Sequence, residues 1–267
     1  MLLSLLIATI LPAQATTYGY RLPVADLLDG SERVVRGTVA ETSAELGKDG
    51  LIWTVVTLDV SETLSRSNAA QVLFRLPGGT VGDLSLTIPG APEFQAGQEV
   101  MVFLDGDRLR GFGQGAFLIE EGKAWRGLGN AFEAEPVRRP VHQIIGDLPA
   151  ARDCIRTRTQ ASYSEGWSLR GTHSTRMSDG EEQAMSITLV GGIEYRFEAC
   201  GDAQTGPLDL VVYDTDGREL AWDTGDKGSA GLGFRPEHTG EYYVAIVNQS
   251  LAPDALRAGV VLSLSYR

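Results

Sequence analysis

Histidine is scarce in this chain, and that scarcity limits the metal chemistry available to it. The sequence contains three histidines, His142, His173 and His238, which lie far apart. It has no His-Glu-x-x-His segment, the pattern that places two zinc ligands and a general base on one helix. A zinc site would have to form from scattered residues, so we expect no metal-dependent hydrolase.

Sequence patterns of other enzyme classes are also missing. No Gly-x-Ser-x-Gly segment occurs, which excludes the nucleophile elbow of an α/β-hydrolase. No P-loop occurs, and the glycines of 111–115 and 127–129 do not link a strand to a helix as a dinucleotide-binding loop does. We predict a non-enzymatic protein without catalytic residues and with no cofactor other than calcium.

Positive charge is in short supply. The chain has 23 Lys and Arg against 35 Asp and Glu, a net charge of −12. Residues 16–150 carry 12 basic and 18 acidic side chains, and residues 151–267 carry 11 and 17. A uniformly acidic surface repels phosphate backbones and anionic lipid, so we expect no nucleic-acid partner and a soluble exported protein.

No apolar run in the chain is long enough to span a bilayer. The longest run lies at the N-terminus. Residues 1–15 form a short apolar stretch that ends in Ala13-Gln14-Ala15, the pattern of a secretory signal peptide. The stretch is shorter than the ~20 residues that span a bilayer. No basic residue precedes it, so the true start lies upstream, the signal is weak, or the segment is a buried strand. We expect a secreted or periplasmic protein with no membrane span in the mature chain.

Only two cysteines are present, Cys154 and Cys200. In an oxidising compartment a lone pair is expected to form a structural disulfide. Closing this loop of 47 residues would stabilise the fold by about 4 kcal/mol in the chain-entropy model. We expect the bond to tie the segment between two domains to the C-terminal domain. Neither flanking sequence resembles that of a cysteine nucleophile.

Residues 16–135 alternate apolar and polar side chains, which is typical of short strands. Gly37 interrupts the first of them, and a glycine inside a strand often marks a bulge. A long glycine-interrupted first hairpin favours a small closed barrel of OB type, with another small β-barrel or sandwich as the alternative. The expected strands cover 33–43, 51–64, 72–76, 99–104, 108–112, 115–120 and 123–128.

A family resemblance in this region rests on five segments: Val34–Val39, Pro77–Gly79, Pro89–Phe94, Gly97–Leu104 and Gly113–Phe117. Through them the region resembles a family of exported, OB-like bacterial proteins. That resemblance implies an architecture and no activity.

Residues 136–165 differ in composition. Prolines bracket Val141–Ile145, which leaves room for one or two helical turns, and residues 150–158 could form another short helix. We expect a solvated linker whose basic residues balance the acidic domains. These are Arg138, Arg139, Arg152, Arg156 and Arg158.

Residues 166–267 show strand patterns at spacings of about ten residues, the rhythm of a β-sandwich. Val190–Ile193 and Asp216-Gly217 supply hairpin turns. The expected strands cover 167–171, 184–190, 193–199, 207–213, 218–223, 229–234, 241–249 and 258–266.

Three features of this region carry a second resemblance: the aromatic strand after Gly191-Gly192, the Leu208–Leu210 strand with its Asp-x-Asp-Gly turn, and Gly240–Ala245. They resemble the bacterial pre-peptidase C-terminal domain. The resemblance implies a jelly-roll-like β-sandwich of a kind often appended to secreted proteases. It also implies a module that binds or solubilises and performs no chemistry. The fold class expected for the whole chain is therefore all-β.

Two further sites are candidates for binding. Neighbouring turns place several carboxylates together, and hard oxygen ligands suit Ca²⁺, although Asp-Gly is also an ordinary hairpin turn. Trp125, beside Lys123 and Arg126, is the aromatic of the first domain best suited to contact a ligand. The candidate calcium ligands are Asp214, Asp216, Asp223 and Asp226, with Asp202 and Asp209 nearby.

These observations predict an exported, non-enzymatic two-domain binding or accessory protein. Its partner is expected to be an exported protein or a cell-envelope glycan. The alternative function is that of an inhibitor or accessory of a secreted peptidase, because inhibition needs a complementary shape and no activated groups.

Overall fold

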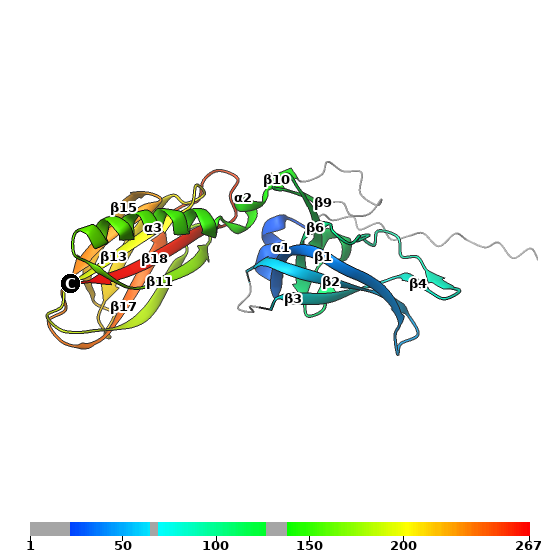
Figure 1. Cartoon of the computed structure of the whole chain (residues 1–267), viewed down its shortest axis with the longest axis horizontal. Coiled ribbons are helices and arrows are strands. Elements are labelled where there is room, and N and C mark those ends of the chain that lie inside the picture. The colour runs from blue at the N-terminus through cyan, green and yellow to red at the C-terminus, as the bar shows by residue number, and fades with distance from the viewer. Residues whose placement is uncertain (1–21, 65–68, 127–137) are drawn as a thin grey trace, which may run out of the picture. The chain divides into compact units, whose positions relative to one another are not determined.

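The computed structural model describes residues 22–64, 69–126 and 138–267, so the predicted signal peptide lies outside it. The chain divides into two compact units, one of Met1–Leu118 with Arg126–Pro136 and one of Ile119–Trp125 with Val137–Arg267. Strands dominate both units (Figure 1), which confirms the predicted all-β class. None of the described helices is long and apolar enough to cross a bilayer. The domain limits proposed from sequence stay a prediction.

The first unit is built around a closed ring of five strands. β1 pairs with β2, β2 with β3, β3 with β7, β7 with β6, and β6 again with β1. The β3–β7 pair is parallel and the others are antiparallel, an arrangement that fits the predicted OB-like barrel. Its elements are α1 (Val24–Gly30), β1 (Arg33–Leu46), β2 (Ile52–Thr63), β3 (Gln71–Pro77), β4 (Gly79–Val81), β5 (Leu84–Leu86), β6 (Glu99–Asp105), β7 (Arg108–Leu109), the 3-10 helix η1 (Phe112–Gly115) and β8 (Ala116–Glu120).

The bulge predicted at Gly37 is present. The register of β1 against β2 shifts between Arg36 and Gly37, and again between Val39 and Glu41. A Cβ at Gly37 would lie 2.3 Å from the backbone oxygen of Asp59, so no larger residue fits without a backbone shift. The bulges allow the long β1 to coil and pair with both β2 and β6.

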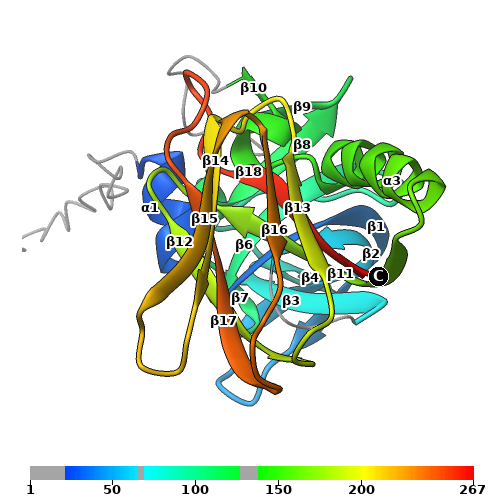
Figure 2. The same cartoon turned by 90° about the vertical axis from the view of Figure 1, so that its left-hand side faces the viewer.

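The second unit is a sandwich of two four-stranded antiparallel sheets, which Figure 2 shows facing each other. The first sheet has the order β11-β18-β13-β16 and the second has the order β12-β17-β14-β15. Side chains of both sheets, among them Phe197, Leu210, Val244 and Leu262, meet in one core. The elements are β9 (Lys123–Arg126), β10 (Arg138–Pro140), α2 (Val141–Ile145), α3 (Leu148–Ser164), β11 (Ser168–Met177), β12 (Glu182–Leu189), β13 (Tyr195–Gly201), β14 (Pro207–Tyr213), β15 (Glu219–Lys227), β16 (Ser229–Phe234), β17 (Gly240–Asn248) and β18 (Ala258–Tyr266).

The segment expected to be a linker with short helices contains one helix of 17 residues, α3. The Asp147 side chain caps its first turn by accepting a hydrogen bond from Ala150 N at 3.0 Å. Ala151 and Ile155 pack against Val261, on the outward side of the first sheet. The helix is therefore longer than predicted, because burial of its apolar stripe stabilises it beyond its local propensity.

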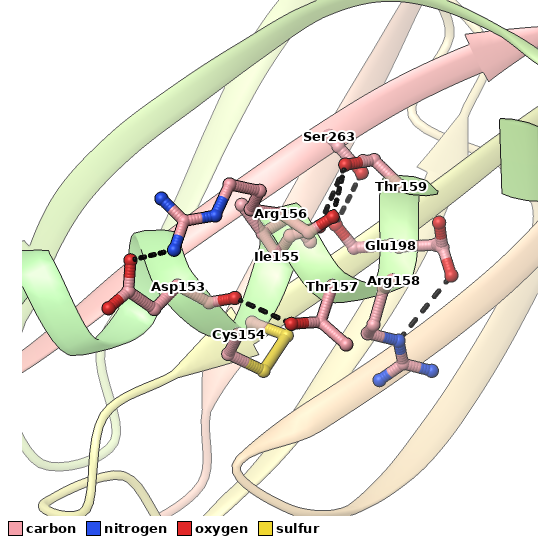
Figure 3. Close-up of a disulfide and its surroundings, with 10 residues drawn as sticks. Asp153, Cys154, Ile155, Arg156, Thr157, Arg158, Thr159, Glu198 and Ser263 are labelled. Carbon is pink, nitrogen blue, oxygen red and sulfur yellow. Dashed lines mark hydrogen bonds and ion pairs between the residues drawn. A yellow bond between two sulfur atoms is a disulfide. The ribbon is translucent and has the colours of Figure 1, made fainter. Parts of the chain in front are cut away.

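The predicted disulfide is present and joins Cys154 of α3 to Cys200 of β13 (Figure 3). As expected, the bond joins residues 136–165 to the C-terminal sandwich, and both cysteines lie in the second unit. It cross-links a covering helix to the sheet beneath it. The buried Glu198 extends this contact by accepting hydrogen bonds from Ser162 Oγ at 3.0 Å and Arg158 Nε at 3.4 Å.

Replacing both cysteines, Cys154→Ser with Cys200→Ser, should lower the free energy of unfolding by about 2–4 kcal/mol. The unfolded chain regains the loop entropy that the bond removes, while the helix loses its covalent attachment. Urea unfolding measures the difference. Dithiothreitol should shift the wild type by the same amount and leave the double variant unchanged, and an equal midpoint for all samples would contradict this role.

Candidate functional site

The two outward faces of the sandwich differ in what covers them. α3 packs on β11, β13 and β18 of the first sheet, as Figure 1 shows. The outward face of the second sheet instead presents Trp222 of β15, which is 66% exposed. An exposed aromatic side chain of this size marks a candidate contact surface where other aromatic side chains lie beside it.

Strand register places two tyrosines on the same face as Trp222. Leu210 and Val212 of β14 are buried in the core, so the alternate residues Val211 and Tyr213 point outward. Trp222 pairs with Val211, and Tyr213 pairs with Tyr243 of β17. We call Trp222, Tyr213 and Tyr243 the aromatic face.

Small and polar residues continue this surface across the sheet. Val211 pairs with Ala245, which pairs in turn with Ala184 of β12. Tyr243 pairs with Ser186, whose hydroxyl lies 2.6 Å from the carboxylate of Glu241. The aromatic rings thus stand beside short side chains: Tyr243 is 36% exposed, and Ala245 is fully covered.

Carboxylates surround the aromatic face. Burial of the phenol, with the nearby charges of Glu182 and Glu219, raises the pKa of Tyr213 above its ordinary value of 10.0. The phenol is therefore protonated at neutral pH and acts as a neutral donor and acceptor. The face combines apolar rings with hydrogen-bond acceptors and repels anions.

The residues predicted to bind calcium are mostly engaged elsewhere. Asp214 accepts hydrogen bonds from the backbone of Arg218 at 2.8 Å and of Asp216 at 3.0 Å, and pairs with the Arg218 guanidinium. The backbone N–H of Arg218 contributes most to lowering the pKa of the Asp214 carboxyl. Asp223 accepts a hydrogen bond from Gly231 N at 2.8 Å, while Asp226 is exposed.

The two further acidic candidates also have partners. Asp202 is buried and accepts hydrogen bonds from four groups: the backbone of Asp147, Gln204 and Gly259 and the hydroxyl of Thr205. Asp209 accepts one from the Gln249 side-chain amide. In the part of the chain that the structure describes, no three His, Cys, Asp or Glu side chains form a group that could hold a metal ion. Calcium binding stays a prediction.

The histidines and Trp125 do not form a common site. His142 lies in α2, His173 in β11 and His238 just before β17. Trp125 lies in β9, paired with Arg138 of β10, and is partly buried. A binding role for Trp125 stays a prediction.

Sequence reasoning missed the aromatic face, although a signal for it exists. In Leu208–Tyr213 the even-numbered positions are all apolar, so Tyr213 falls on the opposite face of the strand. The same alternation places Tyr243 opposite the buried Val244 and Ile246. The alternation does not reveal that β15 pairs with β14, and this pairing brings Trp222 beside the two tyrosines.

Comparisons with known proteins give partial likenesses only. No protein-family model matches the chain, and no curated protein matches its sequence. The chain is similar to a periplasmic inhibitor of g-type lysozyme from Aeromonas hydrophila, with 10% identity over 36% of this chain and 85% of that one and a TM-score of 0.30.

Two further structures are similar to the chain. The pre-peptidase C-terminal domain of a Bacillus anthracis collagenase has 13% identity over 36% of this chain and 89% of its own, with a TM-score of 0.29. The secreted serine protease VesC from Vibrio cholerae has 10% identity over 87% of this chain and 44% of its own, with a TM-score of 0.26. Function is therefore inferred below from the geometry of the second unit alone.

Alkaline titration tests the environment of the aromatic face. Tyr213 should ionise above its ordinary pKa because burial and the carboxylates of Glu182 and Glu219 disfavour the phenolate. The measurement is the tyrosinate absorbance of the wild type minus that of a Tyr213→Phe variant. A difference curve centred at or below the ordinary value would contradict this environment.

The calcium site has a separate test. If calcium binds the native turns, millimolar Ca²⁺ must raise the melting temperature, because a ligand that binds only the folded state stabilises it. Asp214→Asn should then abolish the increase, with Asp83→Asn, in the first unit, as the control. A melting temperature that Ca²⁺ leaves unchanged would refute the prediction of a calcium site.

Proposed function

We propose that this protein is an exported, non-enzymatic binding protein whose aromatic face holds a neutral glycan. The observation that carries the proposal is the exposure of Trp222 beside Tyr213 and Tyr243 on an outward sheet face. An indole or phenol ring stacks on the C–H-rich face of a pyranose ring, and exposed rings on neighbouring strands can contact successive sugars.

The polar groups on this face favour a glycan over a protein partner. The core of a protein interface is depleted in charged residues. Here Glu241 and Glu219 lie on the same face, and Ser186 and Glu241 form a hydroxyl–carboxylate pair. Such acceptors match a ligand rich in hydroxyl donors, and their charge disfavours anionic polymers.

Export is supported by the disulfide between Cys154 and Cys200, because such bonds persist in oxidising compartments. A binding role is supported by the arrangement of the cysteines and histidines, which are not grouped as catalytic side chains would be. Both cysteines of the chain are joined in the disulfide, and the three histidines lie apart, in α2, in β11 and just before β17.

Trp222→Ala should weaken glycan binding by roughly tenfold or more, because it removes the most exposed stacking ring. The probes are amorphous cellulose, chitin and purified peptidoglycan, with depletion of the protein from solution as the readout. The matched control is Tyr163→Ala, which removes an aromatic residue 74% exposed on α3, away from the aromatic face.

Equal depletion by wild type and Trp222→Ala would refute the proposal, as would the absence of binding to all three polymers. Inhibition of a secreted peptidase by the wild type, lost in Trp222→Ala, would instead assign the aromatic face to a protein partner. Because Trp222 is exposed, its removal should change the free energy of unfolding by no more than about 0.5 kcal/mol.

A further inference from the structure

The sandwich is open along one edge and closed along the other. β11 and β12 are the outer strands of different sheets on the same side, and neither is backbone-paired with the other. At the far edge β15 and β16 lie close together and share the hydrogen bond between Asp223 and Gly231. The β11–β12 edge is therefore the more open of these two edges.

A slot of about 240 Å³ opens at this edge. Gly171, Thr172 and His173 of β11 form one side of its mouth together with Arg170. Most of the lining side chains are apolar, and these come from both sheets. They are Met185, Ile187, Phe197, Val244, Leu262 and Leu264.

The slot exists because β11 lacks a side chain where one should fill it. Gly171 pairs with Leu264, and His173 pairs with Leu262, so both occupy positions that face the core. A Cβ built on Gly171 meets no atom within 4 Å. The register shift between Leu169 and Gly171 displaces Arg170 from the regular ladder at the same point.

Side-chain hydrogen bonds close the two ends of the slot. Thr175 Oγ1 lies 2.6 Å from Gln183 Oε1, which joins β11 to β12 at one end. At the other end Arg170 Nη1 donates to the backbone oxygen of Thr188 at 2.8 Å. Between these two bridges, Met185 and Ile187 of β12 border the opening and are only partly buried.

The size of the slot limits its occupant. It is larger than the cavity of about 150 Å³ that takes a benzene ring, and smaller than the ~300–1,000 Å³ of pockets for drug-sized molecules. One alkyl chain or one ring therefore fits. The aromatic face suits a sugar, but this slot is lined mainly by apolar side chains, which cannot pair with hydroxyls.

The charge at the mouth limits the occupant further. On a chain of net charge −12, the exposed Arg170 forms no ion pair with any described residue. Its one hydrogen bond, to Thr188, leaves the other guanidinium N–H groups available to an acceptor. A guanidinium binds a carboxylate through two parallel hydrogen bonds.

We propose that the slot binds an aliphatic carboxylate, with the alkyl chain between the two sheets and the carboxylate on Arg170. The site is distinct from the aromatic face and does not depend on glycan binding. Alkyl burial supplies the affinity, while the guanidinium selects an anionic head group.

Calorimetric titration of the purified full chain tests the site. Decanoate should bind, and decanol and decylamine, which have the same chain length, should bind roughly tenfold or more weakly. Gly171→Val should abolish decanoate binding because its side chain fills the slot. The matched control is Gly233→Val in β16, whose new Cβ also meets no atom within 4 Å and which should bind like the wild type.

Arg170→Gln tests the contribution of the carboxylate head group separately from that of the alkyl chain. It should weaken decanoate binding about tenfold and leave decanol binding unchanged, and as an exposed substitution it should not affect folding. The control is Arg235→Gln, another exposed arginine that donates to a backbone oxygen, that of Gly192. Trp222→Ala should bind decanoate normally, so failure of one site does not affect the test of the other.

Several results would overturn the proposal. Normal decanoate binding by Gly171→Val, with an unchanged melting temperature, would show that the chain binds elsewhere. Equal binding of decanoate and decanol would contradict the proposal that Arg170 recognises the carboxylate. Binding of an amidated apolar peptide that Gly171→Val abolishes, without binding of decanoate, would assign the slot to a protein segment.

Discussion

The contact between α3 and one sheet determines which surfaces of the second unit are available. A two-sheet sandwich has two outward faces, and this chain supplies a long helix for one of them. Ala151 and Ile155 bury apolar surface against Val261, and the disulfide holds the helix in place. α3 covers the first sheet, whereas the outward face of the second sheet presents Trp222, Tyr213 and Tyr243.

The edges of the sandwich follow a similar asymmetry. Where β15 and β16 approach each other, Asp223 and the backbone of Gly231 join the two sheets. Where β11 and β12 end the sheets, side chains bridge the gap only at its two ends. A missing side chain at Gly171 then leaves room for a ligand in the interior. The two proposed sites therefore differ in character: one is an outward sheet face flanked by polar groups, and the other is a slot lined mainly by apolar side chains.

Much of the local structure could be predicted from the sequence. Alternation of apolar and polar residues predicted most strands, because only one side of each faces a core. Gly37 predicted a bulge, and the structure shows that no Cβ fits there. Two cysteines with an export pattern predicted one disulfide. The length of α3 was underestimated, because its stability depends on packing against β13 and β18, which lie later in the chain.

The candidate sites depend on neighbours that no local pattern specifies. The sequence by itself determined the all-β class, the Cys154–Cys200 pair and the acidic surface, since these follow from composition and short-range alternation. Only the tertiary structure decided that Trp222 lies beside Tyr213 and Tyr243, or that Gly171 lies between Arg170 and an apolar interior. Both arrangements arise from strand order and register, which join residues distant in the chain, and side-chain period alone cannot reveal which strands become neighbours.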